Sequence, residues 1–289
     1  MPTFLERLND SRPQLLDGAT GTELDRRGLD LSRPLWSARS LLSHPEIVRE
    51  IHESYVEAGA DVITANTFRT HDRNVRDEGL NGRDMTRLAV EIAREAADDR
   101  AFVVGSIAPL QDCYRPELTL PEDVLAEEHR MMAGNLADAG VDGILVETQL
   151  TIREAVAATQ AATATKLPTI VSFVCGMDGK LLSGELLTEA VHAVIDFTPT
   201  ALLVNCVPAD VVVGLLKEIH ETAPDVRIGA YANTGRYDAE TGWSDTIAVD
   251  ADAYAELARD WLTTGATIIG GCCGTTPQHI RALRPLIDE

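Results

Sequence analysis

Three cysteines occupy positions from which they could hold one metal ion. Cys206 ends a short apolar run, and Cys272 and Cys273 are adjacent in a glycine-rich segment near the C-terminus. Thiolates favour zinc among the common cellular metals, and three protein ligands with an open fourth position are typical of catalytic zinc sites. Adjacent cysteines can bind the same ion only where the backbone turns sharply, which the flanking glycines permit.

Two alternatives compete with this zinc interpretation. No C-x-x-C pair accompanies the three cysteines, so a vicinal disulfide or two inert buried thiols also fit the spacing. Structural disulfides are rare in cytoplasmic proteins, which weighs against the first alternative. The other two cysteines, Cys113 and Cys175, lie outside this pattern, and we expect Cys175 to be a small buried hydrophobe.

Polar residues follow apolar runs elsewhere in the chain. Asp17 follows the first run, Asn66 and Thr67 follow the second, Glu147 ends the fourth, and Asn233 follows the seventh. Carboxylates and amides at such positions can bind the polar groups of a small substrate. For Glu147 the alternative is a salt bridge to a neighbouring loop.

The elements that must position these residues form one repeated pattern. Short β-branched runs alternate with longer stretches of helical periodicity. The expected strands are Gln14–Ala19, Asp61–Ala65, Phe102–Ile107, Gly143–Glu147, Thr169–Cys175, Leu202–Cys206, Arg227–Tyr231 and Thr267–Gly271. The expected helices lie near 45–58, 84–97, 121–139, 151–164, 187–196, 210–222, 251–264 and 277–287.

Eight such units predict an α/β fold, specifically a (β/α)8 TIM barrel forming a single domain over residues 1–289. A doubly wound open sheet is the alternative, but the glycines after the first strand do not form a G-x-G-x-x-G motif. Active sites of TIM barrels lie at the C-terminal ends of the strands. The barrel therefore brings the three cysteines, Asp17 and Glu147 to one rim.

The segment Gly270–Thr275, with the upstream pair Asn205-Cys206, resembles the zinc-binding signature of the homocysteine S-methyltransferase family, specifically its small single-domain members. The resemblance continues in order along nearly the whole chain. It includes the segments Leu16–Leu24, Pro34–Ala38, Tyr55–Asp61, Thr64–Phe68, Val146–Thr148 and Tyr231–Gly235.

This resemblance implies a zinc-dependent enzyme that transfers a methyl group to the thiol of homocysteine and forms methionine. Zinc is then the cofactor, and homocysteine and a small methyl donor are the partners. The residues that match the family pattern would bind zinc and activate the thiol through Cys206, Cys272 and Cys273. They would bind the substrates through Asp17, Gly18, Glu147, Trp36 and Asn233.

The donor loops depart from the family pattern. Small members that use S-methylmethionine carry Gly-Pro-Tyr-Gly after the third strand, where this chain has Ala108–Gln111, and Arg236 replaces a usual glutamate. S-methylmethionine and S-adenosylmethionine remain the expected donors. The alternatives are a homocysteine-activating module that receives methyl groups from a separate cobalamin protein, and a non-catalytic zinc–thiolate sensor. A metal-dependent hydrolase is disfavoured because none of the seven histidines forms a ligand motif.

The composition and charge of the chain bear on its partners and its location. The chain has 25 Lys and Arg against 46 Asp and Glu, a net charge of −21, which argues against nucleic acid as a partner. No apolar run is long enough to span a membrane, and the N-terminus lacks the layout of a secretory signal, so we expect a cytoplasmic protein.

The acidic residues also indicate how the surface is solvated. The carboxylates are dispersed along the chain and there are only three lysines, which indicates a halophile-like surface that stays solvated at high salt. The oligomeric state is left open.

Overall fold

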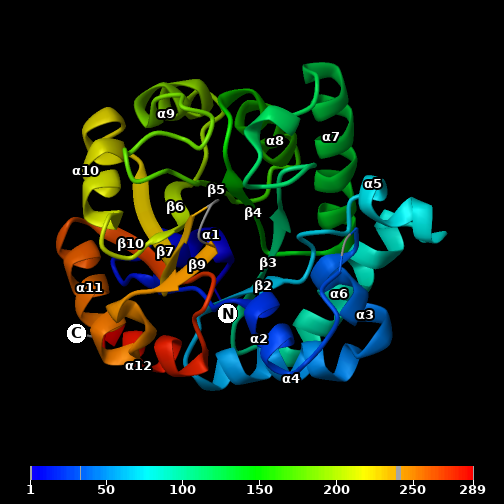
Figure 1. Ribbon diagram of the computed structural model, residues 1–289, viewed down its shortest axis with the longest axis horizontal. Helices are drawn as coiled ribbons and strands as arrows, with labels where there is room; N and C mark the ends of the chain where they lie inside the picture. Colours follow the sequence, from blue (N-terminus) through cyan, green and yellow to red (C-terminus); the bar gives the residue numbers. More distant parts are fainter. Residues whose placement is uncertain (1, 33, 239–241, 289) are drawn as a thin grey trace.

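A closed barrel of parallel strands forms the centre of the protein (Figure 1). The computed structural model describes residues 2–32, 34–238 and 242–288. The sheet order is β1-β10-β7-β6-β5-β4-β3-β2, and a parallel bridge between Leu16 and Val62 joins its two edges. This closure confirms the predicted (β/α)8 architecture. The barrel strands are β1 (Gln14–Leu15), β2 (Val62–Ala65), β3 (Phe102–Ile107), β4 (Gly143–Gln149), β5 (Thr169–Phe173), β6 (Ala201–Pro208), β7 (Arg227–Asn233) and β10 (Ala266–Gly271).

Eight long helices surround the barrel (Figure 1). Several begin where the sequence supplies a cap: the side chains of Asn81, Thr151 and Asp250 each accept a backbone N–H of the first turn. These helices are α4 (Pro45–Glu57), α6 (Gly82–Ala97), α7 (Glu122–Ala139), α8 (Ile152–Ala164), α9 (Leu187–Ile195), α10 (Val212–Thr222), α11 (Ala251–Thr263) and α12 (Pro277–Asp288).

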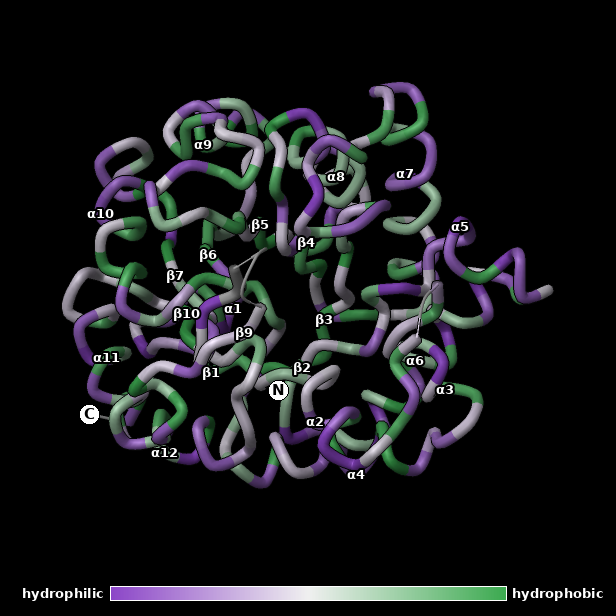
Figure 2. The backbone as a smooth tube through the Cα atoms, viewed as in Figure 1, coloured by the Kyte–Doolittle hydropathy of each residue, from purple (hydrophilic) through white to green (hydrophobic). Residues whose placement is uncertain are grey.

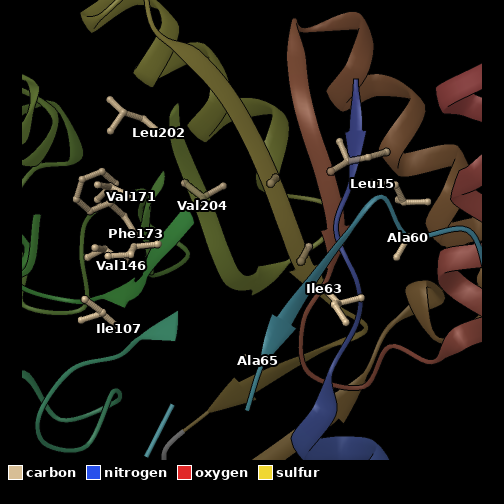
Figure 3. Packing of buried hydrophobic residues seen from close by; sticks show 14 of the residues in the cluster. Leu15, Ala60, Ile63, Ala65, Ile107, Val146, Val171, Phe173, Leu202 and Val204 are labelled. Atoms are coloured by element: carbon tan, nitrogen blue, oxygen red, sulfur yellow. The ribbon is translucent and has the colours of Figure 1, made fainter. Parts of the chain in front are cut away.

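The hydrophobic core has two layers. The larger layer fills the space between the outer face of the barrel and the helices; Figure 3 shows part of it, with Val146, Phe173 and Val204 on three barrel strands. The smaller layer fills the barrel interior and includes Leu145 and Leu203. In Figure 2 the strands are mainly hydrophobic and the outward turns of the helices mainly hydrophilic. The strands, apolar on both faces, therefore hold the rim residues on a rigid support.

A short N-terminal helix, α1 (Phe4–Leu8), covers the end of the barrel at which the strands begin. Phe4 packs with the interior layer, and its ring centroid lies 5.2 Å from that of Phe102. Gly143 provides the space, since a Cβ there would come within 2.7 Å of the Phe4 ring. The end of the barrel at which the strands begin is therefore filled by apolar side chains.

The rim carries elements that the sequence pattern did not predict. They are α2 (Thr20–Arg26), α3 (Ser40–Ser43), α5 (Asp72–Val75), the 3-10 turns η1 (Trp36–Arg39), η2 (Arg76–Glu78), η3 (Pro116–Leu118) and η4 (Ile247–Val249), and a hairpin of β8 (Gly235–Asp238) and β9 (Gly242–Asp245). The expected first strand, Gln14–Ala19, is shorter than predicted because the chain leaves the sheet after Leu16 and enters α2 at Thr20. The expected fifth strand ends at Phe173 rather than Cys175, which instead bridges Leu181.

Across the described ranges, no helix is both long and apolar enough to cross a membrane.

Candidate functional site

A cavity of about 430 Å³ opens at the C-terminal end of the barrel. Residues from the ends or following loops of β1, β2, β3, β4, β6, β7 and β10 contribute to its wall. Of the predicted site residues, the structure places Asp17, Gly18, Trp36, Glu147, Cys206, Cys272 and Cys273 on this wall. Residues distant in sequence therefore meet in one small volume.

The three cysteines form a compact cluster. The Sγ atom of Cys206 lies 2.8 Å from that of Cys272 and 4.0 Å from that of Cys273, and all three sulfurs fall within 4.8 Å of one another. All five cysteines of the chain are free thiols. Sulfur ligands of a tetrahedral zinc ion lie roughly 3.8 Å apart, given Zn–S bonds of about 2.3 Å. The soft donor set and its spacing therefore fit one zinc ion after a small movement of the side chains.

The backbone around the cysteines turns as the glycines predicted. Gly274 has φ +85°, and a Cβ there would lie only 2.0 Å from Thr234 Oγ1. The N–H of Cys273 donates to Asn233 Oδ1 at 3.1 Å, and the N–H of Cys272 donates to the carbonyl of Ala232 at 2.8 Å. Residues at the end of β7 thus hold the backbone of both adjacent cysteines. A hydrogen bond from Cys206, with one from Cys272, holds the pKa of Cys273 well below its usual range.

Glu147 lines the cavity from β4, and among the described residues its carboxylate has two hydroxyl partners. Ser106 Oγ donates to its Oε1, and the Tyr231 hydroxyl donates to its Oε2 at 3.2 Å. No ion pair to this carboxylate exists in the described part of the chain, unlike the loop salt bridge considered above. Burial raises its pKa to about 7. A carboxylate that is buried beside a cavity and lacks a cation is suited to a cationic ligand group.

Asp17 lies at the end of β1 with its carboxylate against β2. The backbone N–H and the hydroxyl of Thr64 donate to it at 2.8 and 3.0 Å. Burial raises its pKa to about 7, and the charge of Glu147 adds to this shift. The adjacent Gly18 permits close packing, because a Cβ there would lie 2.7 Å from the Tyr55 ring.

Besides Tyr231, three aromatic residues line the cavity: Trp36, Phe68 and Tyr114. The Trp36 and Phe68 ring centroids are 5.4 Å apart in an edge-to-face arrangement. Tyr114 donates a hydrogen bond to the Cys273 sulfur. Sequence reasoning proposed only Trp36 of these three, since Phe68 and Tyr114 gave no signal apart from following predicted strands.

Other amides and hydroxyls at the rim hold the wall of the cavity in place, and Asn66 itself lines the cavity. Asn66 exchanges two hydrogen bonds with Ser37, at 2.7 and 2.9 Å, and so ties the Trp36 segment to β2. Thr67 accepts the N–H of Ser106 at 2.9 Å. Asn233 was expected to bind substrate, or to orient a ligand or the loop of Cys206; it accepts the backbone N–H of Cys273 and does not line the cavity.

Comparisons with known proteins identify the family of this chain. A family model described as homocysteine S-methyltransferase matches residues 14–287. Homocysteine S-methyltransferase 1 of Zea mays is 31% identical, covering 94% of each chain, and homocysteine S-methyltransferase YbgG of Bacillus subtilis is 31% identical, covering 96% of each. The structure of the homocysteine methyltransferase MmuM from Escherichia coli, in its metallated form, has a TM-score of 0.84 at 28% identity, covering 97% of this chain and 98% of that one.

Proposed function

Because the chain belongs to the homocysteine S-methyltransferase family and is a methyltransferase that acts on homocysteine, we propose that it depends on zinc and takes its methyl group from a small onium donor. The zinc ligands are Cys206, Cys272 and Cys273. The donor is S-methylmethionine or S-adenosylmethionine. The product is methionine.

The convergence of three thiols and one unpaired carboxylate on one cavity supports this proposal most directly. Homocysteine is a short amino acid with a thiol at one end and an ammonium at the other. The thiol cluster and Glu147 both line the cavity, so they can receive the two ends of one molecule. When bound by the three thiolates, zinc lowers the pKa of a ligated thiol so that its sulfur is a nucleophile at neutral pH.

The carboxylates bind and orient the amino-acid end of homocysteine. Glu147 receives the ammonium, which stabilises the ionised form of a carboxylate whose pKa burial otherwise raises to about 7. Asp17 adds negative charge beside it and, through Thr64, ties the end of β1 to β2. With the ammonium fixed, the homocysteine sulfur is presented to the donor methyl. A new carbon–sulfur bond forms as the donor's bond breaks, and that electron pair returns to the donor.

The aromatic residues bind the onium group of the donor. The faces of Trp36 and Tyr114 can attract a sulfonium through cation–π interactions, whereas the Phe68 ring already has the Arg69 guanidinium 5.1 Å from its centroid. A cavity of about 430 Å³ lies in the lower half of the range for small-molecule sites. It has space for two small amino acids, whereas a corrinoid would have to remain outside. This size favours a diffusible donor over a cobalamin protein.

A panel of donors tests the proposal. Methionine formation from homocysteine should be assayed in parallel with S-methylmethionine, S-adenosylmethionine, betaine and methylcobalamin. We expect turnover with one of the first two. Turnover with methylcobalamin alone would favour the module that serves a separate cobalamin protein. Bound zinc without turnover of any donor would favour the sensor.

We also propose a cytoplasmic location and a surface adapted to high salt. The five free thiols suit a reducing compartment. The net charge of −21 arises from dispersed carboxylates, and the ion pairs of the described surface use arginine, as in the pairs of Arg73 with Glu128 and Arg94 with Asp142. Self-repulsion of such a surface falls as salt screens it.

A further inference from the structure

Asn205 lies on β6 immediately before Cys206 and is completely buried. Its Oδ1 atom accepts the N–H of Thr148 at 3.0 Å and the hydroxyl of Ser172 at 2.7 Å. Its Nδ2 atom donates to Thr148 Oγ1 at 2.9 Å and lies 4.0 Å from Cys272 Sγ. One amide therefore connects β4, β5, β6 and the cysteine segment after β10.

The residues around Asn205 have an unusual backbone. Thr148 has φ +60° and Cys206 has φ +53°, in the left-handed region that β-branched residues in particular avoid. Each also lies within an irregularity of strand register, between Val146 and Gln149 in β4 and between Asn205 and Pro208 in β6. Such bulges redirect side chains at the rims of barrels. Here the redirected side chains are those of Cys206 and of the residues beside Thr148.

Asn205 reaches Glu147 through the backbone of β4. The amide bonds both the N–H and the hydroxyl of Thr148, the residue that directly follows Glu147. Asn205 therefore fixes the stretch of chain from which the Glu147 carboxylate projects, while Ser106 and Tyr231 hold the two carboxylate oxygens.

We propose that Asn205 is a positioning residue that couples the carboxylate receiving the homocysteine ammonium to the thiol cluster. The assignment rests on the proposed function, since it needs both sites to act on one substrate. Through Thr148 the amide fixes Glu147, and through its own backbone and its N–H toward Cys272 it fixes two of the three sulfurs. Loss of the amide should weaken metal binding and homocysteine binding together, although Asn205 contacts neither ligand.

The substitution N205D tests this coupling with little change of shape. Aspartate retains an acceptor for Thr148 and Ser172 but cannot donate to the Thr148 hydroxyl or toward the Cys272 sulfur. Zinc affinity is measured by competition with a chromogenic chelator, and homocysteine affinity by titration of the zinc-loaded protein. Both should fall by roughly 10- to 100-fold, the usual effect of losing a partner of metal ligands. The sulfur-to-metal charge-transfer band of the Co²⁺-loaded protein should also shift.

Two further variants separate positioning from general stability. Q14E makes the same amide-to-acid change at Gln14, which is buried at the opposite end of β1, and should leave both affinities and the Co²⁺ spectrum unchanged even if it lowers Tm. T148A removes the hydroxyl that accepts a hydrogen bond from Asn205 but leaves the Asn205 amide next to the Cys272 sulfur. This variant should therefore weaken homocysteine binding while retaining zinc affinity.

The inference is overturned if folded N205D binds zinc and homocysteine within about twofold of wild type, or if Q14E loses affinity to the same extent as N205D. A wild-type protein that binds no zinc would contradict the proposed function itself, and the coupling with it. Because wild type is measured first, the two failures are distinguishable.

Discussion

Tyr231 on β7 donates a hydrogen bond across the barrel to Glu147 on β4, with 3.2 Å between the phenol oxygen and Oε2. The bond orients the carboxylate without neutralising it, since a phenol supplies no positive charge. Ser106 does the same for the other carboxylate oxygen. Glu147 is therefore oriented toward a cation that no residue in the described part of the chain provides through an ion pair.

Replacing Glu147 should weaken homocysteine binding selectively. We expect E147Q to raise the Kd for homocysteine by roughly 10- to 100-fold, because a charged hydrogen bond contributes about 1.5–3 kcal/mol. The control is 4-mercaptobutanoate, which is homocysteine without its amino group. Wild type and E147Q should bind this analogue equally, and an equal loss for both ligands would show that Glu147 does not bind the ammonium.

The same carboxylate should make stability depend on pH. Burial raises the pKa of Glu147 from 4.5 to about 7, so between these values the folded protein keeps a proton that the unfolded chain releases. The contribution of this group to the stability of the metal-free protein should therefore fall as pH rises from about 4.5 to about 7, by up to about 3 kcal/mol. The buried His52 and His71, whose pKa values burial lowers, act in the opposite direction, so the quantity to measure is the difference between wild type and E147Q in urea unfolding. An equal dependence on pH for the two proteins would contradict the raised pKa.

Each cysteine of the cluster should be necessary for metal binding. We expect about one zinc per chain in wild type and loss of stoichiometric zinc in C206A, C272A and C273A, because two thiolates leave the ion under-coordinated. Elemental analysis after dialysis measures this. C175A is the matched control, since Cys175 is buried outside the cavity. Retention of zinc by any of the three variants would remove that residue from the ligand set.

Trp36 should act on the donor and not on homocysteine. W36L removes the aromatic face while keeping an apolar side chain, so the KM for the onium donor should rise about 2- to 30-fold, as expected for loss of a cation–π contact. W36F should retain most of the affinity. Steady-state kinetics with each substrate varied in turn distinguishes this from a general effect. An equal rise in the KM for homocysteine would indicate that Trp36 only shapes the wall.

Salt should stabilise the protein. With a net charge of −21, repulsion across the surface is screened over about 3 Å at 1 M salt but over about 30 Å at 0.01 M. We therefore expect Tm to fall as KCl is lowered from molar to millimolar concentration. Sucrose at matched osmolality is the control for solvent exclusion. A constant Tm down to millimolar KCl would contradict the adaptation to high salt.

The barrel could be predicted from sequence because its strands are buried on both faces and appear as short apolar runs between helical stretches. Phe102–Ile107 was predicted to the residue, and α4 and α8 to within one residue at each end. The hairpin of β8 and β9 could not be predicted in this way, because its strands are short and carry no apolar run. It follows β7 through Thr234, and the sequence there only indicated a loop.

The site was predictable where local sequence shows the chemistry. The glycines around Cys272 and Cys273 indicate a sharp turn, and the structure has that turn. Ser106 and Tyr231 were missed because they lie within apolar strands and appear as core residues. Their partner, Glu147, lies 41 and 84 residues away in the chain. Only the closed barrel brings them together.

The most direct test of the account follows the methyl group itself. S-methylmethionine and S-adenosylmethionine, each labelled with ¹³C at its transferable methyl groups, are incubated separately with homocysteine and zinc-loaded protein, and methionine is analysed by NMR. We expect wild type to form methionine with a ¹³C-labelled S-methyl group from one of the donors. C206A should form no labelled methionine, and chelator-treated wild type should form none until zinc is restored. Equal labelling by the metal-free protein would contradict the account.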